Sequence, residues 1–198
     1  MMKKNRLMLV TLAAALCLFS WSSALAEMEV YVNPSNGYQI SYPSDWTILN
    51  RETIDMLLGL AVDGNIPGID GAVLGQYAAQ IEQLDVVMFI TPSGDTPTIG
   101  YEDAGIPLSP NLIQTLVCPQ MIAQYEAMFD QVEVLDPGSI VTIGDNEFVF
   151  MSIKATIMGT QMQIDIYSYS HGNLLYSLGF TADDPTTQDI LASFAPGA

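Results

Sequence analysis

Carboxylates dominate the side chains in this sequence that could carry out chemistry. The 198-residue chain has 22 Asp and Glu residues, but only 5 Lys and Arg and a single histidine, His171. Two carboxylates that face each other across a cleft can hydrolyse a glycosidic bond. The pattern singles out no such pair, and the nine tyrosines and Trp46 fall mainly at spacings typical of core residues. We therefore expect no catalytic residues, and a carboxylate-based hydrolase acting outside the cell remains the alternative.

Other common catalytic and cofactor sites lack the residues they require. A zinc site needs three or four His, Cys or carboxylate ligands, and beyond residue 26 the chain has one His and one Cys, Cys118. The sequence contains no G-x-S-x-G nucleophile elbow, no P-loop and no G-x-G-x-x-G turn. We expect no metal ligands and no cofactor, and we interpret Cys118 as a small buried hydrophobic residue.

One acidic loop partly matches a calcium-binding loop. Asp63, Asn65 and Gly68 occupy positions one, three and six of an EF-hand pattern, but position twelve is Leu74 instead of the bidentate glutamate. A Gly/Pro-rich connection between two helices explains the same residues more simply. Calcium-dependent surface binding is therefore kept as a second alternative function.

The first 26 residues have the features of a secretory signal peptide. Lys3, Lys4 and Arg6 precede an apolar run over residues 7–19, which ends near an Ala24-Leu25-Ala26 cleavage motif. Cleavage would leave residues 27–198 with 22 acids and two permanent cations, a net charge of 2 − 22 = −20. We expect a secreted or periplasmic protein. Its charge should disfavour binding to nucleic acid and to anionic membrane surfaces.

The remaining 172 residues are enough for one domain with a substantial core. Alternating residues predict strands at 30–32 and 38–42, with a turn at Asn36-Gly37 between them. Helical spacing predicts helices over about 50–61 and 74–84, joined by a flexible connection. A strand at 86–90 follows, then a long acidic loop over 92–110 with one short strand near 98–101.

A helical segment is predicted to begin at Ser109-Pro110, where a hydroxyl cap precedes a proline in the first turn. Pro119 should kink this helix or start a second one. Five apolar residues then follow helical spacing and are expected to face the core: Met121, Ile122, Tyr125, Met128 and Phe129. A short closing helix is expected after Asp184-Pro185, with Ile190, Leu191 and Phe194 pointing inward.

Between these helices the sequence predicts consecutive hairpins. A two-residue Gly159-Thr160 loop would bring apolar residues on the two strands face to face and place Lys154 opposite Asp165. A three-residue Ser170-His171-Gly172 loop would then put Tyr176, Leu178 and Phe180 on that same buried face, with Gly172 in a left-handed conformation. The apolar residues expected on this face are Val149, Met151, Ile153, Ala155, Ile157, Met162, Ile164 and Ile166.

Both ends of the chain beyond the signal peptide resemble PsbP-like domains. Residues 37–46 read G-Y-Q-I-S-Y-P-S-D-W, similar to the strand and aromatic-Pro-x-x-Trp element that opens these domains, and a strand over 174–181 before Ser193-Phe194 is similar to their ending. The resemblance implies an α+β fold in which an antiparallel sheet of about six strands has helices on both faces, an α/β/α sandwich. Residues 54–110 form a region that is expanded relative to the family.

The resemblance does not assign a function, because members of this fold have unrelated roles. Our hypothesis from the sequence is a secreted, non-enzymatic binding or accessory module, whose partner is an unknown protein or small molecule. The sequence identifies no ligand-binding residue. Long loops on a rigid scaffold often carry function, so we expect a site in the expanded region if one exists.

Overall fold

A computed structural model of the chain describes residues 27–49, 53, 86–93, 95–157, 160–181 and 186–197. The predicted signal peptide, the two helices predicted within residues 50–84 and the calcium-like loop lie outside these residues. Two compact units are distinguished: residues 43–98 belong to the first, and residues 28–42 and 99–198 to the second.

In the first unit, the described residues include a pair of antiparallel strands. Strand β3 (Thr47–Leu49) pairs with β4 (Val86–Ile90), so the strand predicted at 86–90 is confirmed. Trp46 and Phe89 pack edge to face, with ring centroids 5.9 Å apart. Beyond β4, the Thr91 hydroxyl accepts a hydrogen bond from the Asp95 amide at 3.0 Å, which closes a tight turn.

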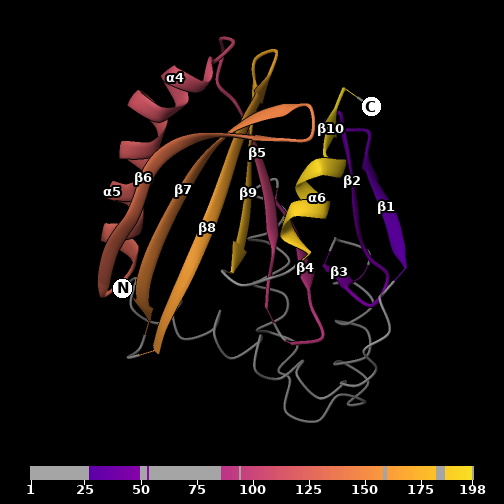
Figure 1. Cartoon of the computed structure of the whole chain (residues 1–198), viewed down its shortest axis with the longest axis horizontal. Helices are drawn as coiled ribbons and strands as arrows, with labels where there is room; N and C mark the ends of the chain where they lie inside the picture. Colours follow the sequence, from indigo (N-terminus) through magenta and orange to yellow (C-terminus); the bar gives the residue numbers. More distant parts are fainter. Residues whose placement is uncertain are drawn as a thin grey trace. The chain divides into compact units, whose positions relative to one another are not determined.

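The second unit contains the main sheet, a small sheet and the helical segments α4, η1, α5 and α6 (Figure 1). The small sheet has the order β1-β2-β10 and the main sheet of this unit has the order β5-β9-β8-β7-β6. The α+β class is confirmed, and the described chain contains ten strands, more than the sequence suggested. The elements of this unit are β1 (Met28–Asn33), β2 (Tyr38–Pro43), β5 (Thr98–Asp103), α4 (Pro110–Leu112), the π-helix η1 (Ile113–Val117), α5 (Cys118–Met128), β6 (Gln131–Ile143), β7 (Asn146–Ile157), β8 (Thr160–His171), β9 (Leu174–Thr181), α6 (Thr187–Ser193) and β10 (Ala195–Pro196).

The β7–β8 hairpin forms in a different register from the predicted one. Ile157 pairs with Thr160, whereas the prediction placed Ile157 opposite Met162. Every cross-strand pair shifts by two residues, and Lys154 lies opposite Gln163 instead of Asp165. A shift of two preserves the side-chain alternation, which is why Val149, Met151, Ile153 and Ala155 are buried as expected. The predicted burial of Met162 is wrong, because this residue near the start of β8 is 37% exposed.

The turn between β8 and β9 also differs from the prediction. His171 pairs with Leu174, so the loop contains two residues, Gly172 and Asn173, instead of three. Gly172 has the predicted left-handed conformation, with φ of 59°.

This register places Tyr176, Leu178 and Phe180 on the sheet face opposite the buried isoleucines. Tyr176 pairs with Tyr169, and Leu178 pairs with Tyr167. All three predicted residues are buried, so their burial is confirmed and only their face was wrong. The prediction assumed a single buried face, whereas both faces of this sheet bury side chains.

The first face is covered by the helical segment that runs from α4 through η1 to α5, which lies alongside β6 (Figure 1). Ser109 caps the segment as predicted, because its hydroxyl accepts a hydrogen bond from the Leu112 amide. The α-helical geometry is interrupted before Pro119, by the π-helix η1, which ends at Val117. Pro119 itself lies in the first turn of α5, so the second of the two predicted possibilities, a helix that begins there, is the closer one. Met121, Ile122 and Tyr125 pack against the core as expected. The predicted burial of Met128 is wrong, because its side chain is exposed.

Strand β6 was not predicted from the sequence, although it is the longest strand described. Its pairing with β7 is interrupted around Asp136, where Asp136-Pro137-Gly138 forms a bulge in place of the turn that these residue types suggest. Gly138 has φ of 139°, and a Cβ added there would lie 3.1 Å from the Cys118 sulfur. The bulge therefore lets β6 approach the helical segment closely, and the Gln114 side chain donates a hydrogen bond to the Gly138 carbonyl.

The second face is covered by aromatic residues around the end of α6. Phe194 follows α6 and contacts the rings of Tyr38, Phe148, Tyr169 and Tyr176, with centroids 5.3 to 6.3 Å apart. Ile190, Leu191 and Phe194 are buried, as the sequence predicted. We call the aromatic part of this face, which consists of Tyr38, Phe148, Tyr169, Tyr176 and Phe194, the aromatic half.

Candidate binding surface

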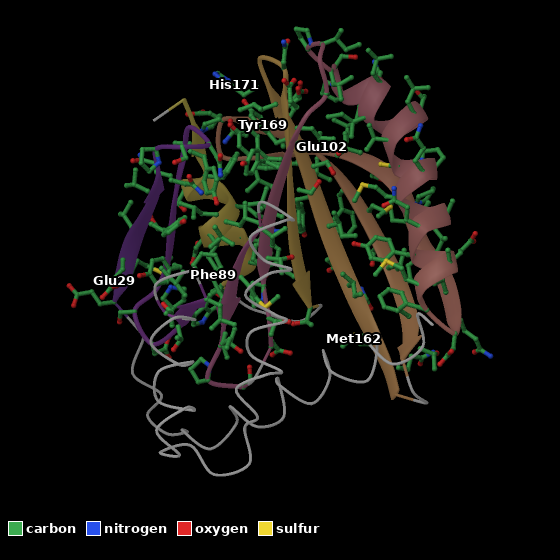
Figure 2. All side chains as sticks on the ribbon, turned by 180° about the vertical axis from the view of Figure 1, so that it is seen from behind. Glu29, Phe89, Glu102, Met162, Tyr169 and His171 are labelled. Atoms are coloured by element: carbon green, nitrogen blue, oxygen red, sulfur yellow. The ribbon has the colours of Figure 1, made fainter. Side chains whose placement is uncertain are left out.

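The other half of the same face carries polar side chains in rows that run across β6, β7 and β8. Directly paired residues in an antiparallel sheet share a face, so the pairing of β6 with β7 and of β7 with β8 defines these rows. Figure 2 shows Tyr169 and Met162 toward opposite ends of β8, and the polar rows lie at the Met162 end. We call this set the polar platform; it consists of Gln131, Glu133, Ser152, Lys154, Thr156, Gln161, Gln163 and Asp165.

A hydrogen-bonded network holds the inner row of the platform in place. The Ser152 hydroxyl donates to Asp165 Oδ1 at 2.6 Å. The Gln163 amide nitrogen donates to Ser152 Oγ at 3.1 Å and to the same Asp165 oxygen at 3.2 Å. Only 3% of the Ser152 surface is exposed, so its hydroxyl needs these bonds to offset the loss of water. The network fixes the orientation of the Asp165 carboxylate.

Several polar atoms of the platform have no partner within the described part of the chain. Asp165 Oδ2 and the carbonyl oxygen of the Gln163 side chain accept no hydrogen bond there. Lys154 makes no ion pair with a described residue, although Glu133 on β6 lies directly opposite it. Lys154 therefore offers a cationic donor, and Gln163 and Asp165 each offer an acceptor. All three side chains are half-buried.

Exposure increases across the platform, from the buried Ser152 to the outer row of Gln131, Thr156 and Gln161. Gln131 and Gln161 are exposed and Thr156 is half-buried. In the described residues, the side chains of this outer row make no hydrogen bonds. A surface that is anchored at one end and open at the other can accept a ligand from solvent.

Phe150 and Tyr167 form the border between the platform and the aromatic half. They are paired across β7 and β8, with ring centroids 5.0 Å apart. Burial raises the pKa of the Tyr167 hydroxyl, and the negative charge of Asp165 raises it further. Tyr167 is 93% buried, since its exposed fraction is 7%, and its hydroxyl has no hydrogen-bond partner among the described residues. It remains protonated at neutral pH and can donate a hydrogen bond next to Asp165.

The other residues singled out by the sequence lie elsewhere. His171 is exposed at the end of β8, 3.3 Å from the position that a Cβ on Gly197 would take. Cys118 is fully buried, as predicted. Burial raises its thiol pKa, and the nearby Asp136 raises it further, which disfavours a reactive thiolate. Arg51 and the Asp63 loop lie outside the described residues.

Two observations concern metals and membranes. In the ranges that the structure describes, no three His, Cys, Asp or Glu side chains gather in a way that could hold a metal ion. Within those same ranges, no helix combines the length and apolar character needed to cross a bilayer.

Sequence reasoning missed the platform because its residues alternate with apolar ones, a pattern also typical of an ordinary solvated sheet face. The polar alternation over Gln161, Gln163 and Asp165 was visible. The Ser152–Asp165 hydrogen bond was not, because it depends on the register of the hairpin.

Comparisons with known proteins identify the fold. No protein-family model matches the chain, and no curated protein matches it either. Among solved structures, it is similar to cyanobacterial PsbP from Synechocystis, with a TM-score of 0.54 and 13% identity, covering 90% of this chain and 98% of that one. The protein therefore has a PsbP-like fold, which confirms the resemblance at its two ends.

Two further solved structures show weaker similarity. One is a protein from Bacteroides thetaiotaomicron, with a TM-score of 0.46 and 14% identity. The match covers 87% of this chain and 49% of that one. The other is LpqN of Mycobacterium tuberculosis, described as involved in cell envelope biogenesis, with a TM-score of 0.43 and 12% identity over 84% of each chain.

Proposed function

We propose that this protein, whose fold is PsbP-like, is an exported, non-enzymatic binding module that holds its ligand on the polar platform. The observation that carries the proposal is the Ser152–Gln163–Asp165 network, which fixes a carboxylate on a half-buried surface. Next to it, acceptor atoms and the Lys154 ammonium have no partner in the described part of the chain. A sheet face that serves only for solvation has no need of such a buried, oriented network.

The arrangement of helices supports an α/β/α sandwich as the finer description of the fold. On one face, α5 packs through Met121 and Ile122. On the other face, Phe194 at the end of α6 packs against Phe148 and Tyr169. We propose that these two layers correspond to the helices that the resemblance placed on both faces of the sheet.

Export from the cytoplasm is the second part of the proposal, and it rests on the basic, apolar and A-x-A segments of residues 1–26. Export is tested by the molecular mass of the protein recovered from the culture medium or periplasm, which shows whether residues 1–26 have been removed. We expect a chain that begins at Glu27. Full-length protein confined to the cytoplasm would contradict export.

The proposed ligand site is tested by what remains bound to the exported protein. We expect the wild-type protein to retain a component of its native medium, and the Asp165→Asn variant to lose it. Asp145→Asn is the matched control, because Asp145 is an exposed aspartate in the turn between β6 and β7. Equal retention by the wild type and both variants would contradict a site on the platform.

The same experiment separates binding from hydrolysis. A binding module returns the retained component chemically unchanged after prolonged incubation. Release of cleaved fragments by the wild type, but not by Asp165→Asn, would favour the carboxylate-based hydrolase.

Calcium-dependent binding is tested separately, because its loop lies outside the described residues. A ligand that binds only the folded state raises the melting midpoint. Melting the protein with calcium and then with a chelator therefore tests this alternative, and an unchanged midpoint rules it out.

A further inference from the structure

We infer that the polar platform binds a neutral, polyhydroxylated ligand, a short oligosaccharide. The inference rests on the proposed function and specifies the chemical class of its ligand. It is carried by the residue types in the three rows of the platform, by the charges around them and by the shape of the surface.

The outer two rows present amide and hydroxyl groups. Side-chain amides have a donor and an acceptor on adjacent atoms, and a hydroxyl is both a donor and an acceptor. The hydroxyl groups of a sugar have the same dual character, so each can pair with such side chains without leaving a buried polar atom unsatisfied. The groups that provide these contacts are Gln131, Thr156, Gln161 and Gln163.

The charge distribution favours a neutral ligand. The chain has a formal net charge of −17, which repels anionic ligands such as phosphorylated or uronic acid polymers. At the centre of the platform lies Lys154, the only Lys or Arg in the described residues, between Glu133 and Gln163. Lys154 shares its row with Glu133 and adjoins the row that carries Asp165, so the platform has charges of both signs and is complementary neither to a purely anionic nor to a purely cationic ligand. A neutral ligand needs no such complementarity and can still use Lys154 and Asp165 as a donor and an acceptor.

The shape of the platform favours an extended ligand. Three adjacent strands span about 10 Å between the outer two, and Ser152 to Thr156 spans about 13 Å along β7. This surface is a sheet face and is open along its outer row, where Gln131 and Gln161 are exposed. An open face contacts several units of an oligomer but does not enclose a single small molecule, which a pocket would do.

The buried end of the platform provides a directional contact. The Tyr167 hydroxyl has no partner in the described chain, and it lies on the same face as Asp165, two residues along β8. Together they offer a donor and an acceptor to one end of the ligand. Phe150 is half-buried and lies in the same row as Tyr167, so its ring can contact the apolar face of a sugar ring.

Titrations of the exported protein with defined probes test the inference. The neutral probes are tetrasaccharides of cellulose, xylan, chitin and starch. The comparison probes are an oligogalacturonate and a tetraglycine peptide. Backbone amide shifts in NMR locate the binding site and calorimetry gives Kd. We expect at least one neutral tetrasaccharide to shift the amides of β7 and β8 around Lys154 and Gln163, and the oligogalacturonate to bind at least tenfold more weakly.

Variants separate the platform from the rest of the surface. Gln163→Ala and Asp165→Asn should each weaken binding of that tetrasaccharide about tenfold or more. Gln124→Ala is the matched control, because Gln124 is an exposed glutamine on α5, and it should leave Kd unchanged. The melting midpoint of each variant confirms that it is folded.

Two results would overturn the inference, and they differ in what they mean for the proposed function. If the peptide or the acidic oligomer shifts the platform amides and no neutral tetrasaccharide does, the binding site stands and the ligand class is wrong. If the platform amides respond to none of the probes, the oligosaccharide class is again wrong. Whether the platform binds any ligand is then decided by the retention experiment with Asp165→Asn.

Discussion

The aromatic half and the polar platform share one face of β7 and β8, yet their side chains have different roles. The aromatic half is completed by Tyr176 on β9, Tyr38 on β2 and Phe194 after α6, and the platform by Gln131 and Glu133 on β6. In the aromatic half, Phe194 contacts four rings and the Tyr176 hydroxyl donates to the Asn36 carbonyl at 2.9 Å. In the polar platform, the outer side chains have no partner in the described chain; Gln131 and Gln161 are exposed and Thr156 is half-buried. The first half stabilises the fold by burying apolar surface. The outer side chains of the polar platform do not contribute to this burial, so they can be specialised for binding.

The largest expected effect comes from the centre of the aromatic half. Phe194→Ala removes a ring that is 2% exposed and should lower the free energy of unfolding by about 3–5 kcal/mol. Urea unfolding followed by circular dichroism measures this change. A loss below about 1 kcal/mol would show that the aromatic half is not the packed region described here.

Alkaline pH should also act through the aromatic half. Burial raises the pKa of the Tyr38 hydroxyl above its ordinary value of 10.0, so the folded protein keeps the proton at a pH where the unfolded chain loses it. Its contribution to stability is complete below pH 10 and falls as pH rises above 10, by about 1 kcal/mol at pH 11. Unfolding of wild type and Tyr38→Phe at pH 8 and pH 11 measures it. Equal losses in both proteins would contradict this role for Tyr38.

At the buried end of the platform we expect an effect smaller than that of Phe194→Ala. Ser152→Ala removes the donor to Asp165 and an acceptor for Gln163, and should lower the free energy of unfolding by about 1–2 kcal/mol. Thr142→Ala on the neighbouring strand β6 is an exposed hydroxyl control and should change stability by less than about 0.5 kcal/mol. Equal effects of the two substitutions would mean that the network does not order the platform.

The smallest effect on stability is expected in the outer platform. Gln161→Ala removes an exposed side chain with no partner in the described residues, so its free energy of unfolding should stay within about 0.5 kcal/mol of wild type. The same variant should weaken ligand binding measurably by calorimetry. A large loss of stability would show that Gln161 serves the fold, and the contrast between the two halves would then fail.

The alternation of apolar residues was sufficient to predict several strands and the buried residues of β2, β7 and β9. Register was not predictable in the same way, because Gly159 suits either position of a two-residue turn and only packing decides between them. Strand β6 was missed because Asp136-Pro137-Gly138 has the composition of a turn, whereas pairing with β7 and contact with Cys118 make it a bulge. In both cases long-range contacts overrode a local signal.

The platform was unpredictable for a related reason. The sequence placed Asp165 opposite Lys154, as part of an ion pair with only a structural role. In the observed register Asp165 faces Ser152, and Lys154 is left between Glu133 and Gln163. A shift of two residues in the register is therefore the difference between the predicted Lys154–Asp165 ion pair and the observed surface, where polar atoms lack a partner in the described part of the chain. Net charge and residue type alone contain no information about that difference.

A double variant, Lys154→Met with Gln163→Ala, tests most directly whether the platform is a binding surface and not a structural one. Its melting midpoint and its retention of the native ligand are measured in the same preparation. We predict a midpoint within a few degrees of wild type and loss of the retained ligand. A variant that keeps the ligand at wild-type levels while remaining folded would contradict the central claim.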